Sequence, residues 1–155
     1  RRGLEDLDRA LAMNQIGPYQ VQAAISAVHV RANSYRDTDW PEIVALYTAL
    51  DAMSPSPVVK LNRAVAIGMA HGPADGLKTL ETLADDPNLA GYAPLYAARA
   101  DLLRRAGQTD DAISAYRRAL DLTENEIEAR FFRRRLEELA TNKASGRSEK
   151  GGPSA

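Results

Sequence analysis

Apolar residues recur along the chain every three or four positions, which is the spacing of one face of an α-helix. No segment alternates apolar and polar residues over a sustained length, so β-strands are not expected. The pattern predicts an all-α chain of about eight helices, at roughly 3–14, 18–32, 40–53, 57–70, 73–85, 93–106, 109–122 and 126–140.

Residues typical of helix starts stand at the beginning of several of these segments. Prolines precede three apolar patterns, at positions where a first-turn proline loses no helical hydrogen bond: Pro18, Pro57 and Pro94. Asp39 lies three residues before Glu42, and Asn125 lies three residues before Glu128. Both spacings predict a capping box, in which the first side chain accepts from the backbone of the new helix.

The stretch 94–122 predicts two amphipathic helices that are joined at Gly107. Small residues stand where the two helices would touch: Ala100, Ala112 and Ala119. This arrangement is typical of a tetratricopeptide helical hairpin, whose period is about 34 residues. Because such a hairpin cannot bury its apolar face alone, we expect stacked copies. The predicted fold is a right-handed α-solenoid of antiparallel helix pairs with a curved binding surface.

An internal repeat supports this prediction. A shift of 36 residues aligns Arg63 with Arg99 and Ala64 with Ala100. The same shift also aligns large apolar residues in both helices of the later pairs. One shift therefore aligns a whole hairpin with the next.

The 155 residues are enough for one domain of three or four helical pairs. We expect the helical domain over residues 1–140. Residues 141–155 are rich in Ser, Gly, Lys and Pro without apolar periodicity, which predicts a disordered tail. The chain begins at Arg1 without a methionine, and we expect it to be the C-terminal part of a larger protein.

Charge and cysteine content exclude several classes of protein. The net charge of −1 argues against a surface that binds nucleic acid as a whole. Cysteine is absent, so there is no disulfide framework and no thiolate metal site, which is compatible with the cytoplasm. No apolar run approaches the roughly 18 residues that a membrane span needs.

The sequence also lacks the motifs that catalysis or metal binding would need. The two histidines, His29 and His71, fall in different helical pairs, so we expect no metal site and no cofactor. No Gly-rich phosphate loop and no nucleophile motif is present, and we expect a protein that is not an enzyme.

Arginines that recur in successive hairpins are candidates for partner binding. Asn62, Arg63 and Arg99 are the candidates, and the two arginines could point into a groove and bind carboxylates. Alternatively, each arginine ties one hairpin to the next. The arginines of 130–135 alternate with glutamates, which favours a solvated helix face over a partner contact.

A second group of candidates surrounds the only tryptophan. Trp40 is either an exposed interface anchor or a residue that packs the turn onto the core. His29 either faces a groove or covers a helix edge. Tyr19 and Gln22 stand on the same predicted helix as His29 and are further candidates for partner binding.

Several consecutive runs resemble one group of bacterial extracytoplasmic-function (ECF) sigma factors, which carry a tetratricopeptide-like extension after the second promoter-reading domain. These runs are Gly17–His29, Thr38–Trp40, Ile43–Leu50, Pro57–Ala66, Arg99–Leu103 and Tyr116–Leu120. The resemblance covers about residues 3–140. The sequence departs from standard tetratricopeptide repeats at Arg99, where a core leucine is usual, and at Glu124, where a proline is usual.

The resemblance implies a cytoplasmic transcription-initiation factor. The whole protein would join core RNA polymerase and open promoters through N-terminal sigma domains that this chain lacks. Promoter DNA would be contacted only by those domains, so no DNA-reading residue can be transferred. The chain itself would be a regulatory domain whose partners are its own sigma domains or core RNA polymerase.

Two other functions stay open from the residues. The first is a general adaptor that holds extended or C-terminal peptide segments in its groove. The second is a small-ligand sensor, which has only the neighbourhood of Tyr19, His29 and Trp40 in its favour.

Overall fold

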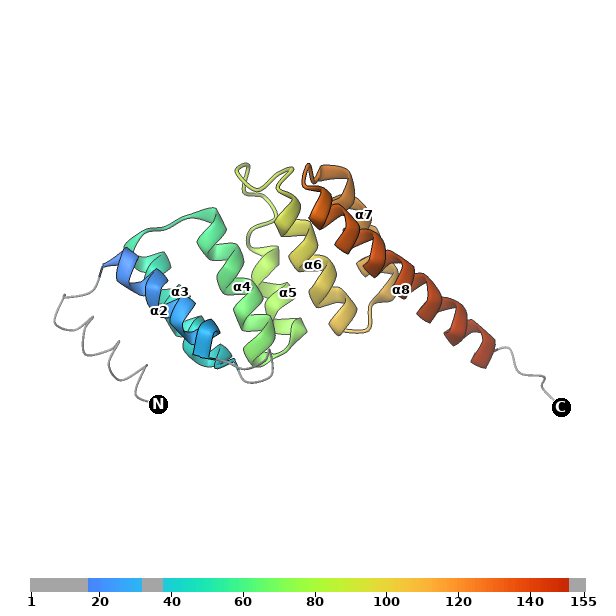
Figure 1. Cartoon of the computed structure of the whole chain (residues 1–155), viewed down its shortest axis with the longest axis horizontal. Helices are drawn as coiled ribbons and strands as arrows, with labels where there is room; N and C mark the ends of the chain where they lie inside the picture. The colour runs from blue at the N-terminus through green and yellow to red at the C-terminus, as the bar shows by residue number, and fades with distance from the viewer. Residues whose placement is uncertain (1–16, 32–37, 151–155) are drawn as a thin grey trace. The chain divides into compact units, whose positions relative to one another are not determined.

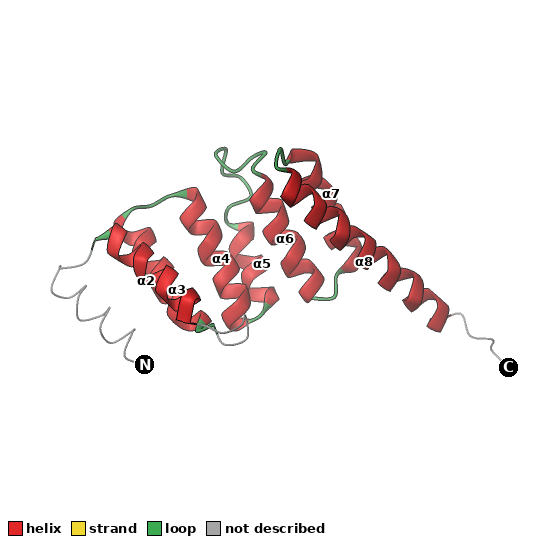
Figure 2. Cartoon of the chain, viewed as in Figure 1, coloured by secondary structure: helices red, strands yellow, loops and turns green. Residues whose placement is uncertain are grey.

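The structure, a computed structural model, describes residues 17–31 and 38–150, with side chains over 17–30 and 38–146. Every regular element within these residues is an α-helix (Figure 2). The helices are α2 (Pro18–Arg31), α3 (Trp40–Met53), α4 (Pro57–His71), α5 (Pro73–Glu81), α6 (Ala93–Arg105), α7 (Thr109–Leu122) and α8 (Glu126–Lys150). The predicted all-α fold of antiparallel helix pairs is confirmed. The helix expected over 3–14 lies outside the described residues.

The chain divides into two compact units, with the boundary between Asp86 and Pro87. The first unit contains α2 to α5, and the second contains α6 to α8 (Figure 1). Within each unit, helices that follow one another in sequence pack against each other.

The core of the first unit forms because α2 and α3 each present one apolar face. The buried residues are spaced by three or four positions on both helices: Val21, Ile25 and Val28 on α2, and Ile43, Leu46 and Leu50 on α3. Ala66 of α4 completes this cluster. Burial of each such Val, Ile or Leu side chain contributes about 1.5–3 kcal/mol to folding, which is the main force holding these helices together.

Side-chain caps fix where the helices of the first unit begin. The backbone N–H of Glu42 donates to Asp39 Oδ1 at 3.1 Å, which confirms the predicted cap of α3. Ser56 caps α4 in the same way, through a 3.4 Å bond from the N–H of Val59 to Ser56 Oγ. Each cap satisfies a backbone donor that the first helical turn cannot pair.

Asn125 caps α8, as predicted, through bonds from the N–H groups of Ile127 and Glu128 to Asn125 Oδ1 at 2.9 and 3.1 Å. The return bond of the box, from the backbone N–H of Asn125 to the side chain of Glu128, runs through a third residue. The N–H of Asn125 donates to Thr123 Oγ1 at 3.2 Å, and this hydroxyl donates to Glu128 Oε2 at 2.7 Å. Thr123 therefore stands between the two residues of the predicted box.

The hairpin of α6 and α7 has the close contact that its small residues predict. Ala100, Ala112 and Ala119 are each 0% exposed. Gly107 ends α6 with φ of +79°, and the N–H of Gln108 donates to the carbonyl of Leu103 at 2.9 Å. This bond closes the helix end in the manner of a Schellman motif, which requires the left-handed conformation at the glycine.

Two helix ends differ from the sequence prediction. Helix α5 stops at Glu81 and not near residue 85, because the backbone tightens there into bonds of shorter range, such as that from the N–H of Leu83 to the carbonyl of Leu80 at 2.9 Å. Helix α8 continues to Lys150, where a disordered tail was expected from Thr141. No proline interrupts this extension, and Lys143 forms an ion pair with Asp110 of α7 at 2.6 Å. Residues 151–155 lie outside the described residues.

Candidate protein-binding surfaces

Trp40 packs the start of α3 onto the core of the first unit. The indole is half-buried and lies against the apolar cluster of α2 and α3. The exposed ring of His29 meets it edge-on, with ring centroids 5.7 Å apart and planes inclined by 74°. This geometry is a favourable aromatic contact between α2 and α3. The structure therefore favours the packing interpretation of Trp40 over that of an exposed anchor.

Tyr19 and Gln22 lie on the solvent side of α2. The side chain of Tyr19 is 81% exposed, and Gln22 and His29 are exposed as well. Residues three and seven positions apart lie on one helix face, so these three side chains share a face. Among the candidates near the tryptophan, the structure brings His29 and Trp40 into contact.

Arg63 ties α4 to α3. Its Nε–H donates to Thr48 Oγ1 at 2.8 Å, and this hydroxyl in turn donates to the carbonyl of Val44 at 2.7 Å. A second link between the same helices, which sequence reasoning missed, joins Lys60 Nζ to Asp51 Oδ1 at 2.9 Å. The structure thus supports the tying interpretation of Arg63 and leaves its neighbour Asn62 exposed.

Arg99 has a different environment. It is exposed on α6 and lines a cleft of about 280 Å³ between α6 and α7, here called the α6–α7 cleft. The cleft is lined by Tyr96, Arg99 and Leu103 of α6 and by Asp111, Ser114, Ala115 and Arg118 of α7. The guanidinium carbon of Arg118 lies 5.6 Å from the centre of the Tyr96 ring. At this distance a cation–π contact holds Arg118 across the opening.

The α6–α7 cleft combines two arginines with one carboxylate and with apolar and aromatic walls. Its charge and shape suit an extended segment with an acidic side chain, since a guanidinium binds a carboxylate through paired N–H donors. Sequence reasoning found Arg99 but missed Tyr96 and Arg118. The spacing of Tyr96, Arg99 and Leu103 by three and four residues was the signal that could have shown this face.

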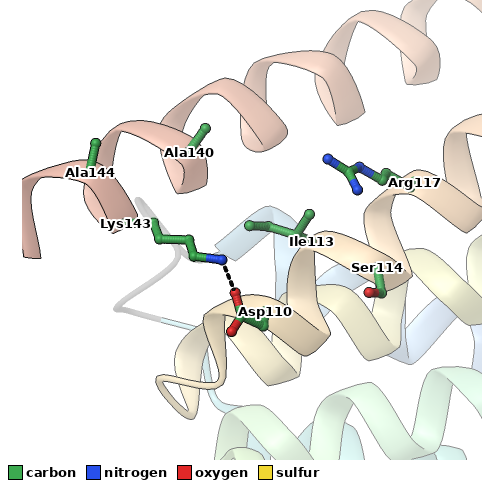
Figure 3. Close-up of a pocket in the computed structure, with 7 residues that line it drawn as sticks. All are labelled: Asp110, Ile113, Ser114, Arg117, Ala140, Lys143 and Ala144. Carbon is green, nitrogen blue, oxygen red and sulfur yellow. Dashed lines mark hydrogen bonds and ion pairs between the residues drawn. The ribbon is translucent and has the colours of Figure 1, made fainter. Parts of the chain in front are cut away.

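A second opening lies between α7 and α8 and has a volume of about 430 Å³. Figure 3 shows the seven residues that line it, with the Lys143–Asp110 ion pair at one end and Arg117 at the other. This groove exists because α8 continues beyond Ala140, so the sequence prediction of a disordered tail could not include it.

The arginines of α8 are mostly paired or exposed, as the alternating charges predict. Arg133 Nη1 lies 3.2 Å from Glu126 Oε1, and Arg130 Nε lies 3.8 Å from the same oxygen. Such exposed pairs contribute little to stability, because water screens them. Arg135 is also paired, with Glu138 Oε2 at 3.0 Å, but its side chain is only 29% exposed.

The described residues hold no group of three or more His, Cys, Asp or Glu side chains that could bind a metal ion. None of the helices described here is long and apolar enough to cross a membrane.

Comparison with known proteins agrees with this fold. Residues 93–136, which contain the α6–α7 hairpin and part of α8, match the tetratricopeptide repeat family. The first tetratricopeptide domain of the human RPAP3 protein, solved by NMR, superposes with a TM-score of 0.63 at 20% sequence identity. The likeness covers 85% of this chain and 98% of that domain.

One relative is similar in sequence over most of the chain. An uncharacterized protein of Rhizobium meliloti (strain 1021) is 42% identical over 139 residues, which are 90% of this chain. The chain spans only 32% of the length of that relative. The chain thus has the fold of stacked antiparallel helix pairs that tetratricopeptide domains have, and residues 93–136 match that repeat in sequence.

Proposed function

We propose that this chain is the regulatory, protein-binding domain of an ECF sigma factor. In the cytoplasm it would contact the sigma domains of the same protein or core RNA polymerase, and so set the activity of the factor. The proposal rests on the consecutive runs that resemble this group, above all Gly17–His29 and Pro57–Ala66. A relative about three times as long as the chain is compatible with a domain that works beside others.

The single observation that carries a protein-binding role is the α6–α7 cleft. Two guanidinium groups, Arg99 and Arg118, stand at an opening that also has an aromatic and an apolar wall. A surface of this composition is suited to a segment of protein, because it offers both charge recognition and apolar contact.

The proposal is tested by transcription in vitro with core RNA polymerase and the full-length factor. Removal of residues 18–140 should change the amount of transcript from a cognate promoter. The double substitution Arg99→Ala with Arg118→Ala should change it in the same direction, because it removes the charges of the cleft while both helices remain.

The matched control is Arg130→Ala with Arg133→Ala, which removes two exposed arginines from α8. The control should leave transcript levels as they are. Unchanged transcription after the deletion would contradict the regulatory role.

A general peptide-binding adaptor is the second candidate, and the positive charge of the α6–α7 cleft favours it. It predicts that Arg99→Ala abolishes capture of a short acidic peptide and leaves the melting temperature unchanged. Arg63→Ala should do the reverse, because Arg63 bonds to Thr48 and lies on another helix. Loss of the Arg63–Thr48 hydrogen bond should cost about 0.5–1 kcal/mol of stability, as expected for a partly exposed hydrogen bond.

Fluorescence anisotropy measures peptide binding, and thermal unfolding measures stability. Equal peptide binding by both variants would reject the adaptor.

A further inference from the structure

The opening between α7 and α8, here called the α7–α8 groove, has the volume of a binding site. It measures about 430 Å³, and ligand pockets in proteins commonly measure about 300–1,000 Å³. Its lining residues come from the N-terminal part of α7 and from the last turns of α8 (Figure 3): Asp110, Ile113, Ser114, Arg117, Ala140, Lys143 and Ala144. The groove therefore has room for side chains of another molecule.

The middle of the groove is apolar and is lined by small side chains on one side. Ile113 is half-buried and lies between the ion pair at one end and Arg117 at the other (Figure 3). Ala140 and Ala144 of α8 are four positions apart, so both lie on the same face of the helix. An apolar side chain of a partner can enter between Ile113 and these alanines, where it is removed from water.

The charges that line the groove do not balance. Lys143 Nζ lies 2.6 Å from Asp110 Oδ1, so these two opposite charges offset each other at one end. At the other end Arg117 is exposed, and its guanidinium group has no ion pair, side-chain hydrogen bond or ring contact among the described residues. Figure 3 shows this side chain extending into the space between the two helices. The groove thus presents one uncompensated positive charge beside an apolar wall.

The spacing of these residues sets the length of chain that fits. Asp110, Ile113 and Arg117 recur every three or four positions on one face of α7. At a rise of about 1.5 Å per residue, Asp110 and Arg117 stand about 10 Å apart along the helix. An extended chain covers this distance in about three residues, at about 3.3 Å each.

We propose that the α7–α8 groove binds a short extended segment of a protein partner, with an apolar side chain between Ile113 and Ala144 and a carboxylate on Arg117. A carboxylate is the complementary group, because a guanidinium binds it through paired N–H donors. The inference rests on the proposed protein-binding function and adds a second surface to it.

This surface is distinct from the α6–α7 cleft. On α7 the cleft uses positions 111, 115 and 118, whereas the groove uses positions 110, 113 and 117. Ser114 lies between the two sets and lines both openings. The neighbouring arginines of α7 therefore serve different surfaces.

The test follows the δ1-methyl signal of Ile113 by ¹H–¹³C NMR of the whole chain, with the signal assigned from Ile113→Val. Ile127 of α8 is 79% exposed and does not line the groove, so its methyl signal is the internal reference. The probe is the blocked peptide acetyl-Leu-Leu-Glu-Glu-amide. Two control peptides each lack one feature: acetyl-Leu-Leu-Gln-Gln-amide has no charge, and acetyl-Ser-Ser-Glu-Glu-amide has no apolar side chain.

We expect the Ile113 signal to shift and to saturate with the probe, while the Ile127 signal stays in place. Each control peptide should bind about tenfold or more weakly, as expected for the loss of one charge-assisted hydrogen bond or one buried leucine. An Ile113 signal that the probe does not move would overturn the proposal. Equal binding of the three peptides would overturn it as well.

A substitution at Arg117 tests whether its charge binds the probe. Arg117→Ala should weaken binding about tenfold or more, because it removes the hydrogen bonds to the carboxylate. The matched control is Arg118→Ala, which removes the same charge from the neighbouring position, where the side chain lies over Tyr96. Equal losses in the two variants would show a nonspecific attraction of charge, and full affinity of Arg117→Ala would also reject the site.

A substitution that fills the groove tests its location. Ala144→Leu should abolish the shift of the Ile113 signal and leave the melting temperature nearly unchanged, since position 144 is exposed. Asn142→Leu is the control, because Asn142 is exposed and points about 200° away around α8. Full probe affinity of Ala144→Leu would contradict the proposal. Failure of the groove would leave the transcription test of the proposed function unaffected, since that test depends on Arg99 and Arg118.

Discussion

Lys143 Nζ lies 2.6 Å from Asp110 Oδ1 and so connects the extension of α8 to the first turn of α7 (Figure 3). The carboxylate stands near the N-terminus of α7, where a negative charge is favourable to the helix dipole. The pair joins residues 33 positions apart in sequence and gives the extension its contact with the α6–α7 hairpin.

Lys143→Ala should loosen the end of α8 without unfolding the domain. Because both side chains are substantially exposed, the pair contributes at most about 1 kcal/mol, so the melting temperature should change little. Amide hydrogen exchange beyond Ala140 should become faster, while exchange in α6 and α7 stays the same. Asn142→Ala, at an exposed position, is the control, and an equal acceleration there would show that the ion pair does not hold the extension.

Replacement of glycine by alanine should have opposite effects on stability at two positions. Gly107 has φ of +79°, so Gly107→Ala should destabilise the domain by about 1–2 kcal/mol. Gly146 lies within α8, and an added Cβ would meet nothing within 4 Å. Gly146→Ala should therefore stabilise the helix there by about 0.5–1 kcal/mol.

Urea unfolding measures the first effect, and circular dichroism with hydrogen exchange measures the second. A stabilised Gly107→Ala protein would contradict the left-handed turn that joins α6 to α7.

Ala112→Leu should destabilise the second unit by about 1–3 kcal/mol, because the alanine is 0% exposed and a larger side chain must push α6 and α7 apart. Ala52→Leu is the control at an exposed position of α3 and should be close to neutral. Thermal unfolding with calorimetry compares the two variants. Equal stability would mean that the two helices do not pack as closely as the buried alanines indicate.

Alkaline pH should destabilise the protein through two tyrosines. Burial raises the pKa of Tyr47 and of Tyr116 above the ordinary value of 10.0. The folded state thus binds these protons more tightly than the unfolded state. The resulting stabilisation is complete below the ordinary tyrosine pKa and is lost as pH rises through the raised values.

Urea unfolding at pH 8 and at about pH 11 measures this loss. Tyr47→Phe and Tyr116→Phe should each make the loss smaller, since a phenylalanine has no proton to release. Tyr19→Phe is the control, because Tyr19 is 81% exposed. A profile that no substitution alters would contradict the role of the buried hydroxyls.

Helix positions were the part of the fold that local sequence features could predict. A cap such as Asp39 or a proline such as Pro57 acts on the backbone within one turn, so its effect is visible without any knowledge of tertiary contacts. The buried alanines of the α6–α7 hairpin were predictable for a similar reason, since a repeat places small residues at fixed intervals.

The candidate site was predicted less completely. Arg63 and Arg99 occupy equivalent repeat positions, yet Arg63 bonds to Thr48 whereas Arg99 lines the α6–α7 cleft. The difference depends on which side chain the neighbouring helix offers, and a repeat alignment contains no information on that partner.

The sequence by itself determined that the chain is helical, where most helices begin and which small residues lie between α6 and α7, because these follow from hydrogen bonds and periodicities within a few turns. Only the tertiary structure decided the roles of Trp40 and Arg63 and the extension of α8. Each of these depends on contacts between residues that are distant in sequence, and their geometry arises only when the helices pack.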